Sequence, residues 1–306
     1  VDWPMRWNEE KVVFEPGGKD HISPGGSYDT AKLVSKKIYD WDAPVTMKYN
    51  FVKLKGVPGK MSSSKGKVIS LVDALEVYQP EVLRYIFAMN KVDHEFSISF
   101  DLDVVTVYEA YDRTERIAWG VDQAKNDEVF LKEKRIYELS QIESGAMSKE
   151  GAVMPYQVPF RLLTTLLQTY SGDIDAVIKS LGDVKPEQEE CLRRRCECAW
   201  YWVKECAPED FKFALREDGS KADLSGDFLN AIKRIRDEVV VKLESYQVDK
   251  DLQQAMYDIA KEIGIDPKAL FTSMYQVLIA KDQGPRLASF MKIIGKEKLN
   301  KLLENY

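Results

Sequence analysis

The spacing of hydrophobic side chains divides the chain into a short mixed part and a long helical part. In residues 28–41 the apolar positions recur every three or four residues, which predicts an amphipathic helix. Residues 11–15 (KVVFE) predict a short strand, and the alternation over 45–55 predicts a strand or hairpin. The order strand, loop, helix, strand is typical of one half of a parallel sheet.

Beyond about residue 70 the helical period dominates. Glycine and proline residues stand between the periodic stretches, as expected where helices stop. The sequence therefore predicts a fold class of α/β followed by all-α. We expect helices over 71–78, 80–89, 103–119, 160–170, 188–206, 227–243, 250–263, 267–278 and 286–294.

Length and composition narrow the class of protein. A chain of 306 residues predicts two or more domains, and 44% hydrophobic with 31% charged residues is typical of globular proteins. No apolar run approaches the ~18 residues of a membrane span, and the first residues lack the apolar core of a signal peptide. Four cysteines at 191, 196, 198 and 206 match no common zinc spacing, so we expect no metal site and a cytoplasmic protein.

The net charge of −6 by itself argues against a nucleic-acid partner. The charge is uneven, however. Residues 48–67 hold six lysines and no acidic residue, and residues 281–301 hold five lysines and Arg286 against Asp282 and Glu297. Such stretches are either solvated faces or contacts for phosphates.

One basic stretch carries candidate chemistry. Residues 60–65 read KMSSSK and are flanked by Gly56, Gly59 and Gly66. Lysine ammonium groups, hydroxyls and the amides of a glycine-flanked loop suit a polyphosphate. The pattern is neither a P-loop nor a dinucleotide fingerprint. Composition alone leaves a solvated surface turn as the alternative.

A second breaker-rich stretch precedes it. In residues 15–30 the glycines, including Gly18, permit close approach of the backbone to a ligand. Asp20 and His21 offer polar anchors for an amine or a ribose, although a histidine beside an aspartate also fits a purely structural role.

The loop resembles the KMSKS signature of class I aminoacyl-tRNA synthetases, with Ser63 at the position of the second lysine. The form KMSSS followed by KG is similar to the class I lysyl-tRNA synthetases of archaeal and bacterial type. The resemblance implies that ATP is bound by Lys60, Met61, Ser62, Ser63 and Ser64, and that Lys60 and Lys65 are catalytic. Residues 15–30 resemble the family's G-x-D-H segment, which implies a substrate-binding role for Gly18, Asp20 and His21.

The resemblance covers essentially the whole chain, through residues 75–101 and 271–299. It implies the second half of a Rossmann-like catalytic domain in 1–70, a helical stem-contact region in 71–180 and an α-helix-cage anticodon-binding domain in 181–306. The family's H-I-G-H signature is absent from the 306 residues. We therefore expect the C-terminal portion of a synthetase, without the N-terminal half of the catalytic domain.

The implied activity is ATP-dependent aminoacylation of tRNA(Lys) with lysine, using ATP with Mg²⁺. Two alternatives remain at this point: a glutamyl-type class I synthetase and a non-catalytic tRNA-binding module. The basic stretches then become candidate tRNA contacts. Their residues are Lys48, Lys53, Lys55, Arg286 and Lys292.

Overall fold

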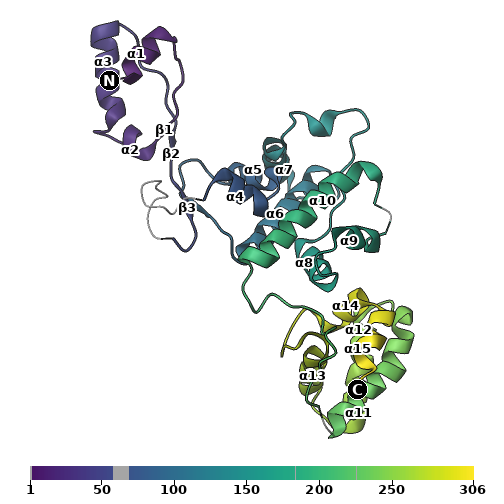
Figure 1. The fold of residues 1–306 in the computed structure, drawn as a ribbon. Helices are drawn as coiled ribbons and strands as arrows, with labels where there is room; N and C mark the ends of the chain where they lie inside the picture. The colour runs from purple at the N-terminus through teal and green to yellow at the C-terminus, as the bar shows by residue number, and fades with distance from the viewer. Residues whose placement is uncertain (1, 58–68, 183, 225) are drawn as a thin grey trace. The chain divides into compact units, whose positions relative to one another are not determined.

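The computed structural model describes residues 2–57, 69–182, 184–224 and 226–306. The chain divides into two compact units, Val1–Met154 and Pro155–Tyr306. Helices predominate in both, and the few strands lie in the first (Figure 1). The three-part division at residues 70 and 180 stays a prediction.

The first unit opens with helices and very short parallel strands. These are α1 (Asp2–Glu9), β1 (Gly17–Gly18), α2 (Lys19–Ile22), α3 (Ser27–Tyr39), β2 (Lys48–Tyr49) and β3 (Val52–Leu54). The parallel pair β1–β2 sets Gly17 opposite Lys48 and Gly18 opposite Tyr49. The parallel pair β3–β4 joins Val52 to Phe96.

The predicted strand over 11–15 is reduced to one bridge between Phe14 and Val45. Residues 45–55 form no hairpin either, since both of their strands pair in parallel with distant segments.

A helical bundle completes the first unit. It contains α4 (Leu71–Val77), α5 (Pro80–Met89), β4 (Phe96–Ile98), α6 (Asp103–Ala118), α7 (Asp127–Ser140) and a 3₁₀ turn (Ala146–Ser148). α7 packs against both α5 and α6. Tyr78 and Tyr108 stack at 6.1 Å in its core, and their hydroxyls donate to the backbone carbonyls of Ser99 (2.6 Å) and Val77 (3.0 Å). Buried tyrosines thus tie α4 to β4 and α6.

The second unit is entirely helical among its described residues. Its elements are α8 (Phe160–Thr169), α9 (Ile174–Ser180), α10 (Pro186–Tyr201), a π-helical turn (Trp202–Cys206), α11 (Gly226–Arg234), a π-helical turn (Ile235–Val239), a 3₁₀ helix (Val240–Ser245), α12 (Asp249–Ile263), α13 (Pro267–Ile279), α14 (Leu287–Ile294) and α15 (Lys296–Leu303). Its C-terminal core gathers buried side chains such as Ile232, Met274 and Phe290.

Local chemistry sets many of these helix ends. α13 begins with Pro267 at its first position, and the Asp266 carboxylate caps it by accepting from the Ala269 amide (3.2 Å). α12 ends at Gly264, whose φ of 84° favours glycine. All ten predicted helices, including the one over 28–41, are present within a few residues, although the 188–206 and 227–243 predictions end in π or 3₁₀ turns.

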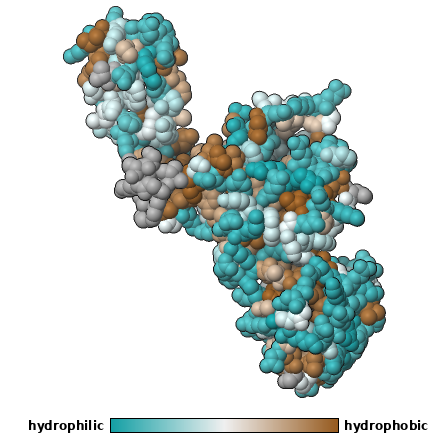
Figure 2. Space-filling view, in the orientation of Figure 1, coloured by the Kyte–Doolittle hydropathy of each residue, from teal (hydrophilic) through white to brown (hydrophobic). Residues whose placement is uncertain are grey.

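Hydrophobic surface gathers around β3 and α4 in the first unit (Figure 2). Exposed apolar side chains there and nearby include Val45, Leu71 and Val72, which are 71%, 68% and 67% exposed.

Candidate functional site

The predicted ATP-binding and catalytic residues lie outside the described residues, and their roles stay predictions. They are Lys60, Met61, Ser62, Ser63, Ser64 and Lys65. Both flanks of this stretch are described. On the C-terminal side, Ser70 caps α4 in a reciprocal arrangement: its hydroxyl accepts from the Asp73 amide (3.1 Å), and the Asp73 carboxylate accepts from the Ser70 amide (2.8 Å).

On the N-terminal side, Lys55 is fixed by two carboxylates. Its ammonium group pairs with Asp101 (3.0 Å) and with Asp103 at the start of α6. Asp101 also accepts from the Ser99 hydroxyl (2.6 Å) and the Asp103 amide (2.9 Å). These hydrogen bonds, with Lys55, lower the pKa of Asp101 to about 2. The end of β3 is thereby attached to the segment that joins β4 to α6.

Two further lysines share one carboxylate. Glu95 pairs with Lys53, and with Lys19 at 3.6 Å. The hydrogen bond from Lys53 is the main cause that lowers the pKa of Glu95. The Lys19 ammonium also lies 4.7 Å from the ring centre of Phe51. One carboxylate therefore holds together two cations from α2 and β3.

The predicted substrate-binding residues occupy the end of β1 and the helical turn that follows it. Gly18 pairs with Tyr49, and a Cβ on Gly18 would lie 3.6 Å from the Tyr49 ring. Asp20 and His21 follow in the single-turn α2, with both side chains exposed.

The His21 ring is held from two sides. Its Nδ1 lies 3.2 Å from the Ser27 hydroxyl, and the ring meets Trp3 edge-on at 5.8 Å. The backbone of Gly26 passes close to that of His21, because a Cβ on Gly26 would lie 2.4 Å from the His21 carbonyl oxygen.

The five candidate tRNA contacts differ in how far they are already neutralised. Lys48 is exposed on β2, and Lys53 and Lys55 are paired as above. In the second unit, Lys292 pairs with Asp249 (2.8 Å) and donates to the Gln247 carbonyl (3.3 Å). Arg286 is exposed at the N-terminal boundary of α14.

The structure brings together part of the predicted set. The turn of Gly18, Asp20 and His21 carries Lys19, whose Glu95 partner also binds Lys53. Sequence reasoning missed the residues that organise this area, namely Trp3, Tyr49, Glu95, Asp101 and Asp103. The acidic ones had a visible signal, since they follow the basic 48–67 stretch and stand before or at the start of the helix predicted over 103–119.

Two other types of site are absent from the described ranges. No group of three or more His, Cys, Asp or Glu side chains there is arranged to hold a metal ion. No described helix is long and apolar enough to cross a membrane.

Comparison with known proteins shows which family this sequence resembles. A family model for class I tRNA synthetases (K) matches residues 1–143. The lysine–tRNA ligase of Treponema pallidum is 52% identical over 307 residues, which cover 100% of this chain and 57% of that protein. Over its whole length the chain is similar to the class I lysyl-tRNA synthetases. The resemblance seen in the signature loop is confirmed.

Other relatives in this family agree. The lysine–tRNA ligases of Borreliella burgdorferi and Thermococcus kodakarensis are 44% and 40% identical, over 100% and 97% of this chain. The chain spans 57%, 57% and 56% of the length of these three relatives. A solved glutamate tRNA ligase from Elizabethkingia meningosepticum, in complex with its amino acid, is 15% identical with a TM-score of 0.39, covering 99% of this chain and 58% of that one. A TM-score this low does not establish a shared arrangement.

Proposed function

We propose that the chain takes part in the ATP-dependent attachment of lysine to tRNA(Lys) through a lysyl-adenylate. The observation that carries the proposal is the 52% identity with a lysine–tRNA ligase across the whole chain. The geometry around β1 supports it, since the turn of Gly18, Asp20 and His21 lies beside the exposed ring of Tyr49. Such a turn offers backbone and polar groups to a small zwitterion.

In the proposed reaction the lysine carboxylate attacks the α-phosphate of ATP and pyrophosphate leaves. Lys60 and Lys65 would neutralise the charge that develops on the pyrophosphate, and the hydroxyls of Ser62–Ser64 would donate hydrogen bonds to it. A hydroxyl of the terminal ribose of tRNA(Lys) then attacks the lysyl carbonyl, which forms the ester and releases AMP. Mg²⁺ would be held chiefly by the ATP phosphates, because no carboxylate cluster among the described residues forms a dedicated site.

The finer architecture belongs to the same proposal. Residues 1–70 would form the second half of a Rossmann-like catalytic domain, which agrees with the parallel pairing of β1–β2 and β3–β4. Residues 71–180 would contact the tRNA stem, and the helices of 181–306 would bind the anticodon. Lys48, Lys53, Lys55, Arg286 and Lys292 would contact tRNA phosphates. The reaction would take place in the cytoplasm, with the other tRNA-charging reactions.

Lysine-dependent ATP–pyrophosphate exchange and tRNA(Lys) charging test this function. Both should be measured on the chain alone and on a chimera that joins it to the part of the Treponema pallidum relative that it does not span. We expect the chimera to activate lysine, and a Lys60→Ala, Lys65→Ala chimera to lose at least 100-fold in rate, roughly what loss of one transition-state contact costs. Binding of tRNA(Lys) without any lysine activation by the chimera would leave a non-catalytic tRNA-binding module. Activation of glutamate in place of lysine would overturn the specificity.

A further inference from the structure

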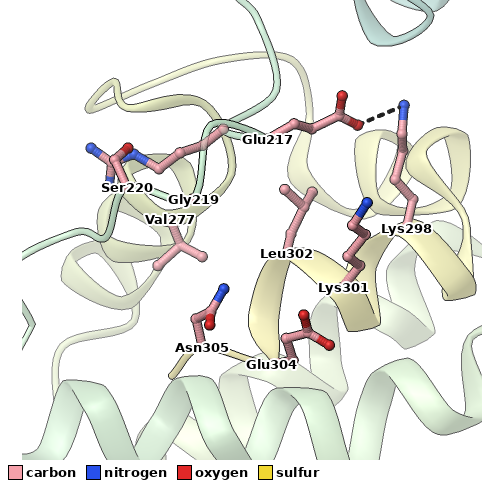
Figure 3. Close-up of a pocket in the computed structure, with 10 residues that line it drawn as sticks. Glu217, Gly219, Ser220, Val277, Lys298, Lys301, Leu302, Glu304 and Asn305 are labelled. Carbon is pink, nitrogen blue, oxygen red and sulfur yellow. Dashed lines mark ion pairs between the residues drawn. The ribbon is translucent and has the colours of Figure 1, made fainter.

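A cavity of about 110 Å³ opens in the second unit, between the 216–220 segment, α13 and α15 (Figure 3). None of the five candidate tRNA contacts lines it. Lys298 and Lys301 stand on one side, Gly219 and Ser220 on the opposite side, and Leu302 between them. The volume equals that of three to four water molecules at about 30 Å³ each, which is room for one tetrahedral oxyanion.

The floor of this cavity holds a cation in an apolar setting. Arg216 lines it together with Val277 and Leu302, which are only 1% and 8% exposed. The Arg216 amide donates to the Leu278 carbonyl (2.8 Å), so its backbone is fixed against the end of α13. Within the described part of the chain, Nε and Nη1 of the guanidinium are shielded from water and have no hydrogen-bond partner.

An unpaired, partly desolvated guanidinium is unfavourable in the free protein. The Asp218 carboxylate offsets part of this cost: its pKa is lowered mainly by the hydrogen bonds from Ser220, and also by the charge of Arg216. Nε and Nη1 still have no hydrogen-bond acceptor among the described residues. An oxyanion in the cavity would offset the rest, since guanidinium groups bind phosphate and carboxylate oxygens in a bidentate manner. The arrangement therefore favours binding of an anion over a purely structural role for Arg216.

Among the charged residues around the cavity, Arg216 and Lys301 are the ones that can bind an anion. Lys298 is engaged by Glu217 (2.9 Å) and donates to the Thr169 carbonyl (3.3 Å). The Asp218 carboxylate accepts from both the amide (3.0 Å) and the hydroxyl (2.7 Å) of Ser220.

Lys301 and Glu304 are the remaining charged lining residues, both exposed at the rim. Water and salt screen Glu304 there far more than they screen the guanidinium in the floor.

We propose that this cavity binds a phosphate group, with Arg216 in its floor and Lys301 at its rim as the anion ligands. The phosphate comes either from an RNA backbone or from free phosphate. The RNA source rests on the proposed function, because it takes tRNA as the partner. The free source does not depend on tRNA at all.

Thermal unfolding in inorganic phosphate, against chloride of equal ionic strength, tests the pocket itself. We expect phosphate to raise the melting temperature of the 306-residue chain, and Arg216→Met to abolish that rise. Without phosphate, Arg216→Met should melt higher than the parent, because it removes the unpaired cation. Lys261→Met, which removes one exposed α12 charge elsewhere in the unit, should keep the full phosphate response. Should Arg216→Met not fold, Lys301→Gln at the rim must weaken the response several-fold.

Binding of tRNA(Lys) transcript across a salt series identifies the source. If the phosphate is in RNA, Arg216→Met lowers affinity about tenfold and reduces the salt slope by about one, while Lys261→Met does neither. A phosphate response with unchanged RNA binding makes free phosphate the ligand. A change in RNA binding without a phosphate response makes it the RNA backbone. Unchanged responses in both assays for Arg216→Met and Lys301→Gln overturn the proposal. Failure of lysine activation would reject the proposed function while leaving the phosphate assay unaffected.

Discussion

Most lysines predicted to meet RNA already have a carboxylate partner. Glu95 pairs with Lys53, Asp101 and Asp103 pair with Lys55, and Asp249 pairs with Lys292. A tRNA phosphate must compete with these partners, so part of the Coulomb attraction is spent on breaking existing pairs. Single residues in the basic stretches should therefore contribute less to RNA affinity than their charge suggests.

Removal of the shared carboxylate tests this competition. In Glu95→Gln, Lys19 and Lys53 lose the group that pairs both of them. We expect tRNA(Lys) to bind more tightly, with a salt slope steeper by about one to two, since one or two more lysines become available to phosphates. Filter binding between 50 and 200 mM salt measures it.

The matched control is Glu150→Gln, which makes the same charge change at an exposed position of the first unit. An identical slope in Glu95→Gln and Glu150→Gln would mean that Lys19 and Lys53 do not reach the RNA.

At the scale of elements, helices were predictable because their signals are local. A period of 3.6, an aspartate cap and a proline at the first position all lie within α13 itself. The strands were not, because β1–β2 joins residues about 30 apart and β3–β4 joins residues 44 apart. No local pattern in residues 11–15 reveals that only Phe14 finds a partner.

The candidate site divides in the same way. The Gly18–His21 turn follows from its glycines and polar residues, which are visible in the sequence. The pairing of Glu95 with Lys19 and Lys53 depends on β4 lying beside β3, and so on contacts formed only in the folded chain.

The α7 helix was missed although its apolar positions 129, 130, 136 and 137 fit a helix.

The junction of β3, β4 and α6 should be sensitive to acid. Asp101 has a folded-state pKa of about 2 against an ordinary value of 3.8, so it favours the ionised, folded state. This stability is complete above about pH 4 and is lost as the pH falls toward 2. The carboxylate is half exposed, so solvent screening reduces the effect to about 1 kcal/mol.

Urea unfolding of the parent and of Asp101→Asn between pH 2 and 6 measures this loss. The two proteins should differ by about 1 kcal/mol at pH 6 and converge near pH 2. If the two curves of unfolding free energy against pH ran parallel over the whole range, these hydrogen bonds would not be lowering the pKa of Asp101 in the folded protein.

The turn between α8 and α9 requires glycine at position 172 both for its backbone conformation and for lack of space, and comparison with Gly182 separates the two causes. Gly172 has a φ of 84°, and a Cβ there would lie 2.4 Å from the Trp200 ring of α10. Gly182 has a φ of 83° but nothing within 4 Å of such a Cβ. Gly182→Ala should therefore cost about 1 kcal/mol for conformation alone.

Gly172→Ala should cost a further ~1–3 kcal/mol, because the indole must move in a packed region. Guanidinium unfolding of both variants gives the comparison. Equal losses would show that contact with Trp200 is not what demands glycine.

On the scale of the whole molecule, the negative net charge conceals local stretches of positive charge. The net charge of −6 argued against an RNA partner, whereas the family relation and the basic stretches argue for one. The carboxylates that produce the average are in part the partners of the basic residues, as Asp249 is for Lys292.

Each unit should fold independently. Pro155–Tyr306 has a core of its own, with Ile232, Met274 and Phe290 fully buried within it. We expect residues 155–306 expressed alone to unfold cooperatively, with the helical circular dichroism of a folded domain. A non-cooperative transition, or one that appears only when residues 1–154 are present, would contradict this.

The contact between Trp3 and His21 makes the molecule its own optical probe. Indole emission responds to the polarity and the quenching groups around the ring, and the imidazole of His21 lies 5.8 Å from the Trp3 ring. A ligand that moves or covers His21 must change the brightness or colour of that emission. The chain has six tryptophans, so the difference between the parent and Trp3→Phe spectra isolates the relevant one. Occupancy of the turn can then be followed in an unlabelled protein.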